Sequence, residues 1–419
     1  MKFDARTDRV LIRAAGDSRR YVMVSFTAPV APPKAGRYPI NVAFVLDRSG
    51  SMSPERKIEL VQEAADKAIG MLREDDRFSV VIYDDKIDVL MESTCASGEA
   101  KRAVRQQLER ITARGSTNLS GGWLTGCEQA ALHINSDVPA KCLLLTDGLA
   151  NQGIVSTDDL TRHASELRQR GVLTSTFGVG RDFDERLLQN MAEAGGGHSY
   201  FIEKAVQIPD FLTSELGETL EIVARDVALQ FSLPAGVDAE PLNRFRHGRV
   251  GDTLRLELGN LVSGQEMRVV TALRFPAGGI GDVLSAGVRL TDRDGAFDTA
   301  PIAMNWTFAD HKDNDVQVRD RVVDAAVAEL YAAKARDEAV EYNRRGEFSR
   351  AKAVMTRTAE RIIGYAGNDP VLNQLAANMV QEAGEYEEHM DAMALKERSY
   401  ESHHMLRNRD PQGKSRRSS

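Results

Sequence analysis

The residues NVAFVLDRSGS, at positions 41–51, join a short apolar run to a polar loop and decide the fold of the segment around them. An apolar run of this length that ends in a polar turn is typical of a strand buried on both faces of a sheet. Residues 53–74 follow, and they carry Ile58, Val61 and Leu72 on one helical stripe. The sequence therefore predicts a strand, a loop and an amphipathic helix, in that order.

The same alternation of apolar runs and amphipathic segments continues as far as residue 205. Further strands are expected at 78–83, 142–146, 172–180 and 199–202, and helices near 99–111, 119–134, 157–170 and 183–194. Parallel strands need crossover connections, which helices usually supply. Residues 41–205 are therefore predicted to form an α/β domain, with a doubly wound, mostly parallel, Rossmann-like sheet and helices on both faces.

Beyond residue 225 the apolar period changes from 3.6 to 2, which is typical of half-buried strands. Five such strands are expected within an antiparallel, sandwich-like β domain at 226–310, namely 227–233, 254–258, 267–275, 284–290 and 302–308. Residues 21–26 show the same alternation. We expect this strand of the N-terminal segment, residues 1–40, to cross back and pair with the later β domain.

The remaining segments are interpreted from helical periodicity and composition. Residues 206–225 are expected to form a linking helix, and residues 315–400 a C-terminal helical region. The last stretch, 401–419, ends in RNRDPQGKSRRSS and is predicted to be a disordered basic tail. His403 and His404 fall in this tail and are interpreted as histidines without a metal.

Composition and charge narrow the class of protein. The 54 Lys and Arg residues and 62 Asp and Glu residues leave a net charge of −8, which argues against nucleic-acid binding through a basic field. Cys95, Cys127 and Cys142 form no CxxC pair, so a disulfide framework or a structural zinc site is not expected, and Cys127 and Cys142 are interpreted as small buried hydrophobes. No apolar stretch approaches the length of a signal peptide core or a membrane helix. We expect a cytoplasmic protein with no membrane partner.

Three polar loops carry the candidate site: Asp47–Ser51, Gly115–Asn118 and Asp147–Gly148. In a doubly wound sheet, the loops at the carboxyl ends of the strands meet in one crevice. Five side chains in these loops offer hydroxyl or carboxylate oxygens: Asp47, Ser49, Ser51, Thr117 and Asp147. A donor set made only of oxygens suits a hard divalent cation, Mg²⁺ first, and offers nothing for a soft metal.

The spacing of Asp47, Ser49 and Ser51 resembles the metal-ion-dependent adhesion site (MIDAS) of von Willebrand factor type A (VWA) domains. Thr117 and Asp147 match the two further positions of that motif. The resemblance implies that the three hydroxyls bind the metal directly, and that the two carboxylates bind it directly or through water. It also implies an open coordination position, which an Asp or Glu of a partner protein fills. Mg²⁺ is the expected metal, with Mn²⁺ or Ca²⁺ as alternatives.

The whole chain resembles the inter-α-trypsin-inhibitor-like and bacterial chloride-channel-accessory-like VWA proteins. This resemblance implies an adaptor that works with an AAA+ ATPase or with a protein kinase and phosphatase system. The channel label of the second group does not transfer to a chain without an expected membrane segment. We therefore expect a non-enzymatic, metal-dependent protein-binding module.

The same three loops allow alternatives to a metal-dependent binding module. Asp, Ser and Gly are common at strand-to-helix turns because they cap helices and permit unusual backbone angles. A metal-assisted phosphate-ester hydrolase could use Asp47 as a nucleophile, although Ser49 stands where haloacid-dehalogenase-like phosphatases have a second acid. A structural scaffold indifferent to metal is the third possibility.

Two further clusters are interpreted without a function. Asp84, Asp85 and Asp88 follow the strand at 78–83 and could rim a metal site, but they are taken as a solvated acidic loop. The run Gly195–His198 is taken as a turn into the last strand of the α/β domain. Neither cluster is expected to bind a ligand.

Overall fold

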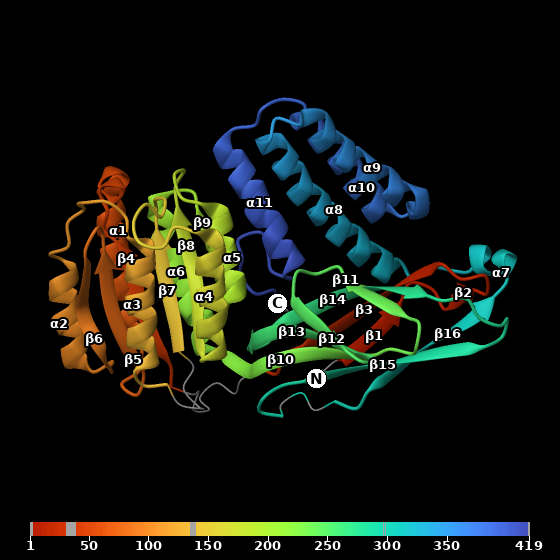
Figure 1. Cartoon of the computed structure of the whole chain (residues 1–419), viewed down its shortest axis with the longest axis horizontal. Helices are drawn as coiled ribbons and strands as arrows, with labels where there is room; N and C mark the ends of the chain where they lie inside the picture. The colour runs from red at the N-terminus through yellow and green to blue at the C-terminus, as the bar shows by residue number, and fades with distance from the viewer. Residues whose placement is uncertain (1–2, 31–38, 135–139, 296, 298, 418–419) are drawn as a thin grey trace. The chain divides into compact units, whose positions relative to one another are not determined.

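The computed structural model of the chain contains two units, whose helices and strands are drawn in Figure 1. Each unit has a hydrophobic core of its own. The structure describes residues 3–30, 39–134, 140–295, 297 and 299–417. The α/β unit comprises Lys34–Leu220, and the β/helical unit comprises Met1–Pro33 together with Glu221–Ser419.

The α/β unit is built on a six-stranded sheet with the order β6-β5-β4-β7-β8-β9. Its strands are β4 (Asn41–Asp47), β5 (Arg77–Tyr83), β6 (Ile87–Cys95), β7 (Ala140–Thr146), β8 (Val172–Val179) and β9 (Gly196–Ile202). All neighbours are parallel except β6, which pairs antiparallel with β5. From β4 the chain moves first toward β5 and later toward β7. The strand order therefore reverses at β4, and the loops after β4 and β7 lie on either side of that reversal.

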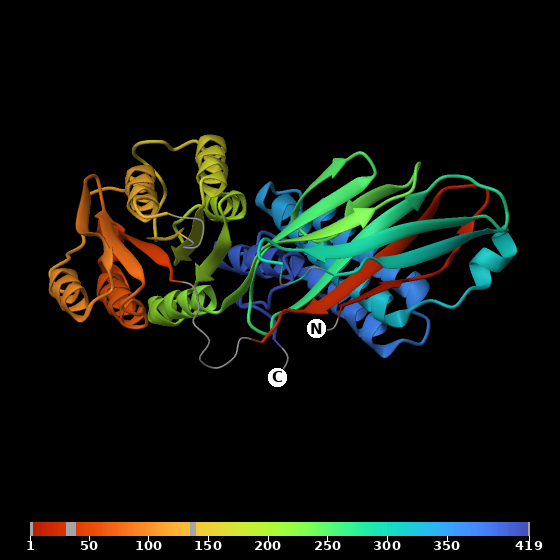
Figure 2. The ribbon, with the colours of Figure 1, turned by 90° about the horizontal axis from the view of Figure 1, so that it is seen from below.

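Helices cover both faces of this sheet (Figures 1 and 2). They are α1 (Lys57–Gly70), α2 (Gly98–Leu108), α3 (Leu119–Ala131), α4 (Thr157–Gln169), α5 (Glu185–Ala194) and α6 (Ile208–Leu220). Helices α1, α2 and α6 share a core with Val42, Phe44 and Leu46 of β4, whereas α3 packs against Val45 on the other face. This division follows from the alternation of side chains along a strand. The predicted doubly wound α/β fold is confirmed.

One expectation for this unit is wrong in part, and one strand was missed. The helix expected at 206–225 is present as α6, but it is not a linker, because it packs Ile208, Leu212 and Leu216 into the core of the sheet. Strand β6 was not predicted, because none of its residues is buried and its apolar run, Val89–Met91, is only three residues long.

The β/helical unit contains two sheets with the orders β1-β3-β14-β11 and β12-β13-β10-β15-β16-β2. The strands are β1 (Phe3–Thr7), β2 (Leu11–Arg13), β3 (Ser18–Thr27), β10 (Ile222–Ser232), β11 (Asp238–Pro241), β12 (Arg246–Val250), β13 (Thr253–Val262), β14 (Glu266–Phe275), β15 (Val283–Thr291) and β16 (Ile302–Ala309). Residues from both sheets form one core, so the sheets make a sandwich. The predicted return of the N-terminal strand is confirmed, since β3 pairs antiparallel with β14 and places Val24 opposite Val269.

Five helices complete this unit: α7 (His311–Val316), α8 (Arg321–Arg344), α9 (Phe348–Ala366), α10 (Pro370–Glu385) and α11 (Ala392–Leu406). Helix α8 packs Val323 and Val327 against Met23 of β3 and Val270 of β14. Helices α9 and α10 share a separate core with α8. Among the described residues, no helix combines the length and apolar composition that crossing a bilayer requires.

The prediction of a disordered basic tail at 401–419 is wrong for the described part of it, residues 401–417. Residues up to Leu406 belong to α11, which buries His403 and His404. Beyond the helix, Asn408 donates a hydrogen bond to the Glu266 carbonyl at 2.8 Å and accepts one from the Arg268 amide at 3.1 Å. The segment is ordered because its polar side chains pair with the exposed backbone of a strand, which composition does not indicate.

Candidate metal centre

The five predicted donors come from three loops at one edge of the α/β sheet. Asp47 is the last residue of β4, and Asp147 follows the last residue of β7. Thr117 directly precedes Asn118, whose side chain caps α3 by accepting a hydrogen bond from the Gly121 amide at 3.0 Å. Strand ends and a helix cap therefore hold all three loops in place.

Asp47 lies at the base of the site and has no exposed surface. Its Oδ1 accepts a hydrogen bond from the Ser49 amide at 2.8 Å, and its Oδ2 accepts one from Thr146 Oγ1 at 2.7 Å. Burial raises the pKa of Asp47 to about 6, although these hydrogen bonds act in the opposite direction. A nearby cation would relieve this cost of burying a carboxylate.

Ser49, Ser51 and Asp147 form a chain of hydrogen-bonded oxygens above Asp47. The two serine hydroxyls lie 3.0 Å apart, and Ser51 Oγ donates to Asp147 Oδ1 at 2.6 Å. The other carboxylate oxygen of Asp147 accepts from Lys57 Nζ at 2.6 Å. The loop after β4 is thus joined directly to the loop after β7.

Thr117 reaches the same place from the third loop. A Cβ atom at Gly148 would lie 3.4 Å from Thr117 Oγ1 and 3.6 Å from Ser51 Oγ, so both hydroxyls flank this glycine. The Thr117 amide donates to Asn151 Oδ1 at 3.0 Å, which holds its loop against the segment after β7. The structure therefore brings together all five side chains that the sequence predicted. Their donors are all hard oxygens, the set that suits Mg²⁺.

Three residues of this site were not predicted from the sequence: Lys57, Thr146 and Asn151. Lys57 has the appearance of an exposed charge at the start of an amphipathic helix. In the sequence Thr146 is simply the last residue of a buried strand. Only the structure shows that its hydroxyl donates a hydrogen bond to Asp47. A polar residue directly before Asp147 was the one available signal.

The acidic loop after β5 is not simply solvated. Asp84 is buried and accepts from Arg114 Nε at 2.7 Å, while Arg48 Nε lies 3.0 Å from the same carboxylate. Arg48 also pairs with Asp88. The interpretation as a solvated loop is wrong for Asp84, because its carboxylate ties the loop after β4 to the loop after β5.

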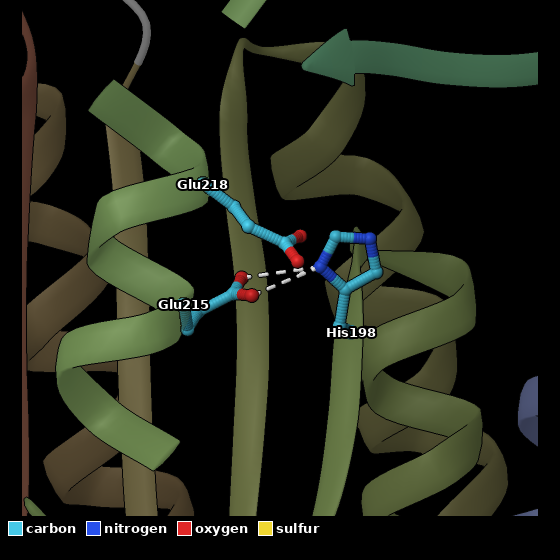
Figure 3. A group of neighbouring side chains, drawn as sticks. All are labelled: His198, Glu215 and Glu218. Carbon is cyan, nitrogen blue, oxygen red and sulfur yellow. Dashed lines mark hydrogen bonds and ion pairs between the residues drawn. The ribbon is translucent and has the colours of Figure 1, made fainter. Parts of the chain in front are cut away.

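A second cluster of potential metal ligands lies elsewhere in the unit (Figure 3). It contains His198 of β9 and Glu215 and Glu218 of α6, each with one ligand atom within 4.8 Å of the others. His198 Nδ1 is 3.1 Å from Glu215 Oε2, and Lys141 of β7 forms an ion pair with Glu215. Lys141 is near the start of β7 and Asp147 follows its end, roughly 20 Å apart along an extended strand. The lysine ammonium already supplies a cation to Glu215, so this cluster is a buried ionic network separate from the five donors.

The sequence of residues 41–214 matches the von Willebrand factor type A domain family. The uncharacterised protein YfbK of Escherichia coli strain K12 is 31% identical over 199 residues, which are 47% of this chain and 34% of YfbK. Inter-alpha-trypsin inhibitor heavy chain H1 of Bos taurus is 26% identical over 223 residues, which are 52% of this chain and 24% of the relative. The chain thus spans about a third or less of the length of these two relatives.

Solved structures resemble a larger part of the chain. A von Willebrand factor type A protein from Catenulispora acidiphila aligns with a TM-score of 0.71 and 20% identity, covering 88% of both chains. The ArnB paralog VWA2 from Sulfolobus acidocaldarius aligns with a TM-score of 0.55 and 18% identity, covering 93% of this chain and 99% of that one. At such identities the likeness concerns the fold alone.

Proposed function

Residues 41–214 form a von Willebrand factor type A domain, and we propose that this domain is a non-enzymatic, Mg²⁺-dependent protein-binding module. In this proposal Asp47, Ser49, Ser51, Thr117 and Asp147 hold the ion, and an Asp or Glu of a partner protein completes its coordination. The observation that carries the proposal is the hydrogen-bonded chain from Ser49 through Ser51 to Asp147, with Thr117 beside Gly148.

The chemistry of the donors supports a cation that stays available to a partner. Mg²⁺ prefers oxygen ligands and usually keeps several waters when proteins bind it. Three of the five donors are neutral hydroxyls, so the two carboxylates balance the charge of the ion without leaving a negative excess that would repel a further carboxylate. A carboxylate from a partner could then replace a water, and the ion would join the two proteins without any reaction.

The proposed partner is defined by its chemistry: it is a protein that presents an Asp or Glu side chain. An AAA+ ATPase or a kinase and phosphatase system is the candidate that the family resemblance suggests, and a cytoplasmic location goes with it. Nucleic acid and membrane are not proposed as partners, since the chain is acidic and its described helices do not suit a bilayer.

No observation favours the alternative of a phosphate-ester hydrolase. Asp47 would be its nucleophile, yet this side chain is buried and both of its oxygens accept hydrogen bonds from within the fold. A nucleophile must reach the reacting atom of its substrate. We therefore propose binding without catalysis.

The test compares metal uptake and partner capture in matched variants. We expect calorimetry to detect Mg²⁺ or Mn²⁺ binding by the wild-type chain, and at least about tenfold weaker binding by Ser49→Ala with Ser51→Ala, because two ligands are lost. Ser53→Ala is the control, since this neighbouring hydroxyl is exposed and caps no helix. Proteins captured from a lysate in Mg²⁺ should be lost both in EDTA and with the double variant.

Two results would contradict the proposal. One is equal metal binding by the wild type and the double variant, which would show that the metal does not bind at the proposed five-residue site. The other is a set of captured proteins unchanged by EDTA, which would instead support a scaffold indifferent to metal. Circular dichroism of each variant confirms that the fold is intact.

A further inference from the structure

We propose that Lys57 is a built-in counter-cation of the metal centre, which weakens the binding of the metal but strengthens the capture of a carboxylate by the loaded site. This inference rests on the proposed function, because it concerns the same five donors. In this inference Lys57 sets the net charge that the metal-loaded site presents to a partner.

The geometry places the Lys57 ammonium against the donors. Lys57 is the first residue of α1, and its Nζ lies 2.6 Å from Asp147 Oδ2 and 3.2 Å from the Ser51 carbonyl oxygen. The side chain of Lys57 is 13% exposed and that of Asp147 is 0% exposed. An ion pair so shielded from water keeps much of its electrostatic strength.

Two other cations of these loops, Arg48 and Arg114, are engaged by other carboxylates. Arg48 forms ion pairs with Asp84 and Asp88, and Arg114 forms one with Asp84. The described hydrogen bonds to Asp47 come from neutral groups, namely the amide and hydroxyl of Ser49 and the hydroxyls of Thr146 and Tyr83. The charged group that acts on Asp47 is the Asp147 carboxylate, which is an anion. Among the described residues, Lys57 is thus the cation that pairs directly with one of the five donors.

The charge balance gives this pairing a consequence. The two carboxylates contribute two negative charges, and Lys57 contributes one positive charge. With a divalent ion bound, the centre carries one net positive charge and attracts a carboxylate, whereas without Lys57 it would be neutral. Before loading, the same lysine repels the incoming ion and occupies one oxygen of Asp147.

Removal of the Lys57 charge should therefore change the affinity for the metal and the affinity of the loaded site for a carboxylate in opposite directions. The metal should bind more tightly, since Asp147 is no longer neutralised. A carboxylate should bind the loaded site more weakly, since the net positive charge is gone. A lysine that only anchors the Ser51 loop would behave differently, because loosening the donors would weaken both affinities together.

The experiment uses the full chain and the variant Lys57→Met, which keeps the length of the side chain and removes its charge. Calorimetry with MgCl₂ should show about tenfold tighter binding than in the wild type. Acetate, added to Mg²⁺-saturated protein and followed by NMR shifts of the loop amides, should bind at least about threefold more weakly. Lys57→Arg should resemble the wild type. Lys67→Met is the matched control, because Lys67 is exposed on the same helix.

Unchanged affinities in Lys57→Met, or a loss of both, would overturn the inference. If Lys57→Met fails to fold, Lys57→Gln makes the same comparison. The proposed function fails separately if the wild type takes up no Mg²⁺. In that case uptake by Lys57→Met would support the weakening of metal binding by Lys57 and overturn its part in carboxylate capture, and no uptake by either protein would overturn both the inference and the proposed function.

Discussion

At the scale of single residues, Asp47 is a carboxyl group that the fold buries, and no cation of the described residues forms an ion pair with it. Its described partners are hydroxyl and amide groups, and burial raises its pKa to about 6 from an ordinary value of 3.8. Between these two values the folded chain binds a proton more tightly than the unfolded chain does. The free energy of unfolding of the metal-free protein therefore falls, through this group, as pH rises from about 4 to about 6.

Because the buried, ionised Asp47 carboxylate destabilises the metal-free protein, we expect Asp47→Asn to stabilise it at neutral pH. In EDTA at pH 7.5 we expect its free energy of unfolding to exceed that of the wild type by about 2–3 kcal/mol, the value of the pKa shift. The difference should shrink as pH falls and vanish toward pH 3, where Asp47 becomes largely protonated in both the folded and unfolded states. Urea denaturation over this pH range measures the difference.

Added Mg²⁺ provides the control for the same variant. The wild type should gain stability as MgCl₂ rises, because an ion that binds only the folded state stabilises it by mass action. Asp47→Asn should gain much less. An Asn variant that is less stable than the wild type in EDTA at pH 7.5 would contradict the prediction that the buried charge is costly.

At the scale of elements, α3 positions one loop of the site through an unusually close contact with the sheet. A Cβ atom at Gly126 would lie 2.1 Å from Val45 Cγ2, and one at Gly122 would lie 2.5 Å from the ring of Tyr83. Neither distance leaves room for a methyl group. The glycines thus allow the helix to approach β4 and β5 closely enough to bring Thr117 beside Gly148.

Gly126→Ala is therefore predicted to destabilise the α/β unit by about 1–3 kcal/mol, the usual cost of overpacking a core. It should also weaken Mg²⁺ binding, since a displaced α3 carries the Thr117 loop with it. Gly70→Ala is the matched helical control: apart from its own helix backbone and chain neighbours, no atom lies within 4 Å of the added methyl group, so a gain of at most about 0.5 kcal/mol is expected at this helix end.

Fluorescence can report on this unit alone. The chain has two tryptophans, and Trp123 lies in α3 while Trp306 lies in β16. In a Trp306→Phe background, urea denaturation followed by Trp123 fluorescence measures the α/β unit. Equal stability of Gly126→Ala and Gly70→Ala would show that the helix can move away from Val45 at little cost.

At the scale of the whole molecule, segments from both ends of the chain meet on β14. Strand β3 pairs along the full length of β14, and Asn408 bonds to the backbone of Glu266 and Arg268 at the start of the same strand. Asn408 has a φ of +58°, a conformation that Asn tolerates better than most residues. The β/helical unit is thus assembled from segments on either side of the VWA domain in sequence.

Asn408→Ala is predicted to destabilise the β/helical unit by about 2–3 kcal/mol, from two lost hydrogen bonds and a strained backbone. In a Trp123→Phe background, Trp306 fluorescence during urea denaturation measures this unit. Gln412→Ala, an exposed position in the same segment, should change little. Mg²⁺ binding should stay at the wild-type value, and a stability equal to that of Gln412→Ala would show that the segment contributes nothing.

The predictability of the site differed from residue to residue for physical reasons. The proximity of Asp47 and Asp147 was predictable because the ends of parallel strands converge, whereas Thr117 was placed with them through the resemblance to the MIDAS motif. Lys57, Thr146 and Asn151 were not predictable, because each acts through a contact with a residue far away in sequence. Asp84 and Asn408 were misread for the same reason, since their burial depends on Arg114 and on β14 respectively.

The sequence by itself determined the order and type of most elements, the doubly wound sheet and the return of the N-terminal strand. These three features follow from apolar periodicity. The period reflects whether one face or both faces of an element are buried, and it can be recognised within a short window of sequence. Only the tertiary structure decided which cation neutralises Asp147, how closely α3 approaches β4, and that the C-terminal segment is ordered. Ion pairs, close contacts and backbone pairing depend on which segments, distant in sequence, come into contact in the fold. A local sequence pattern does not contain that information.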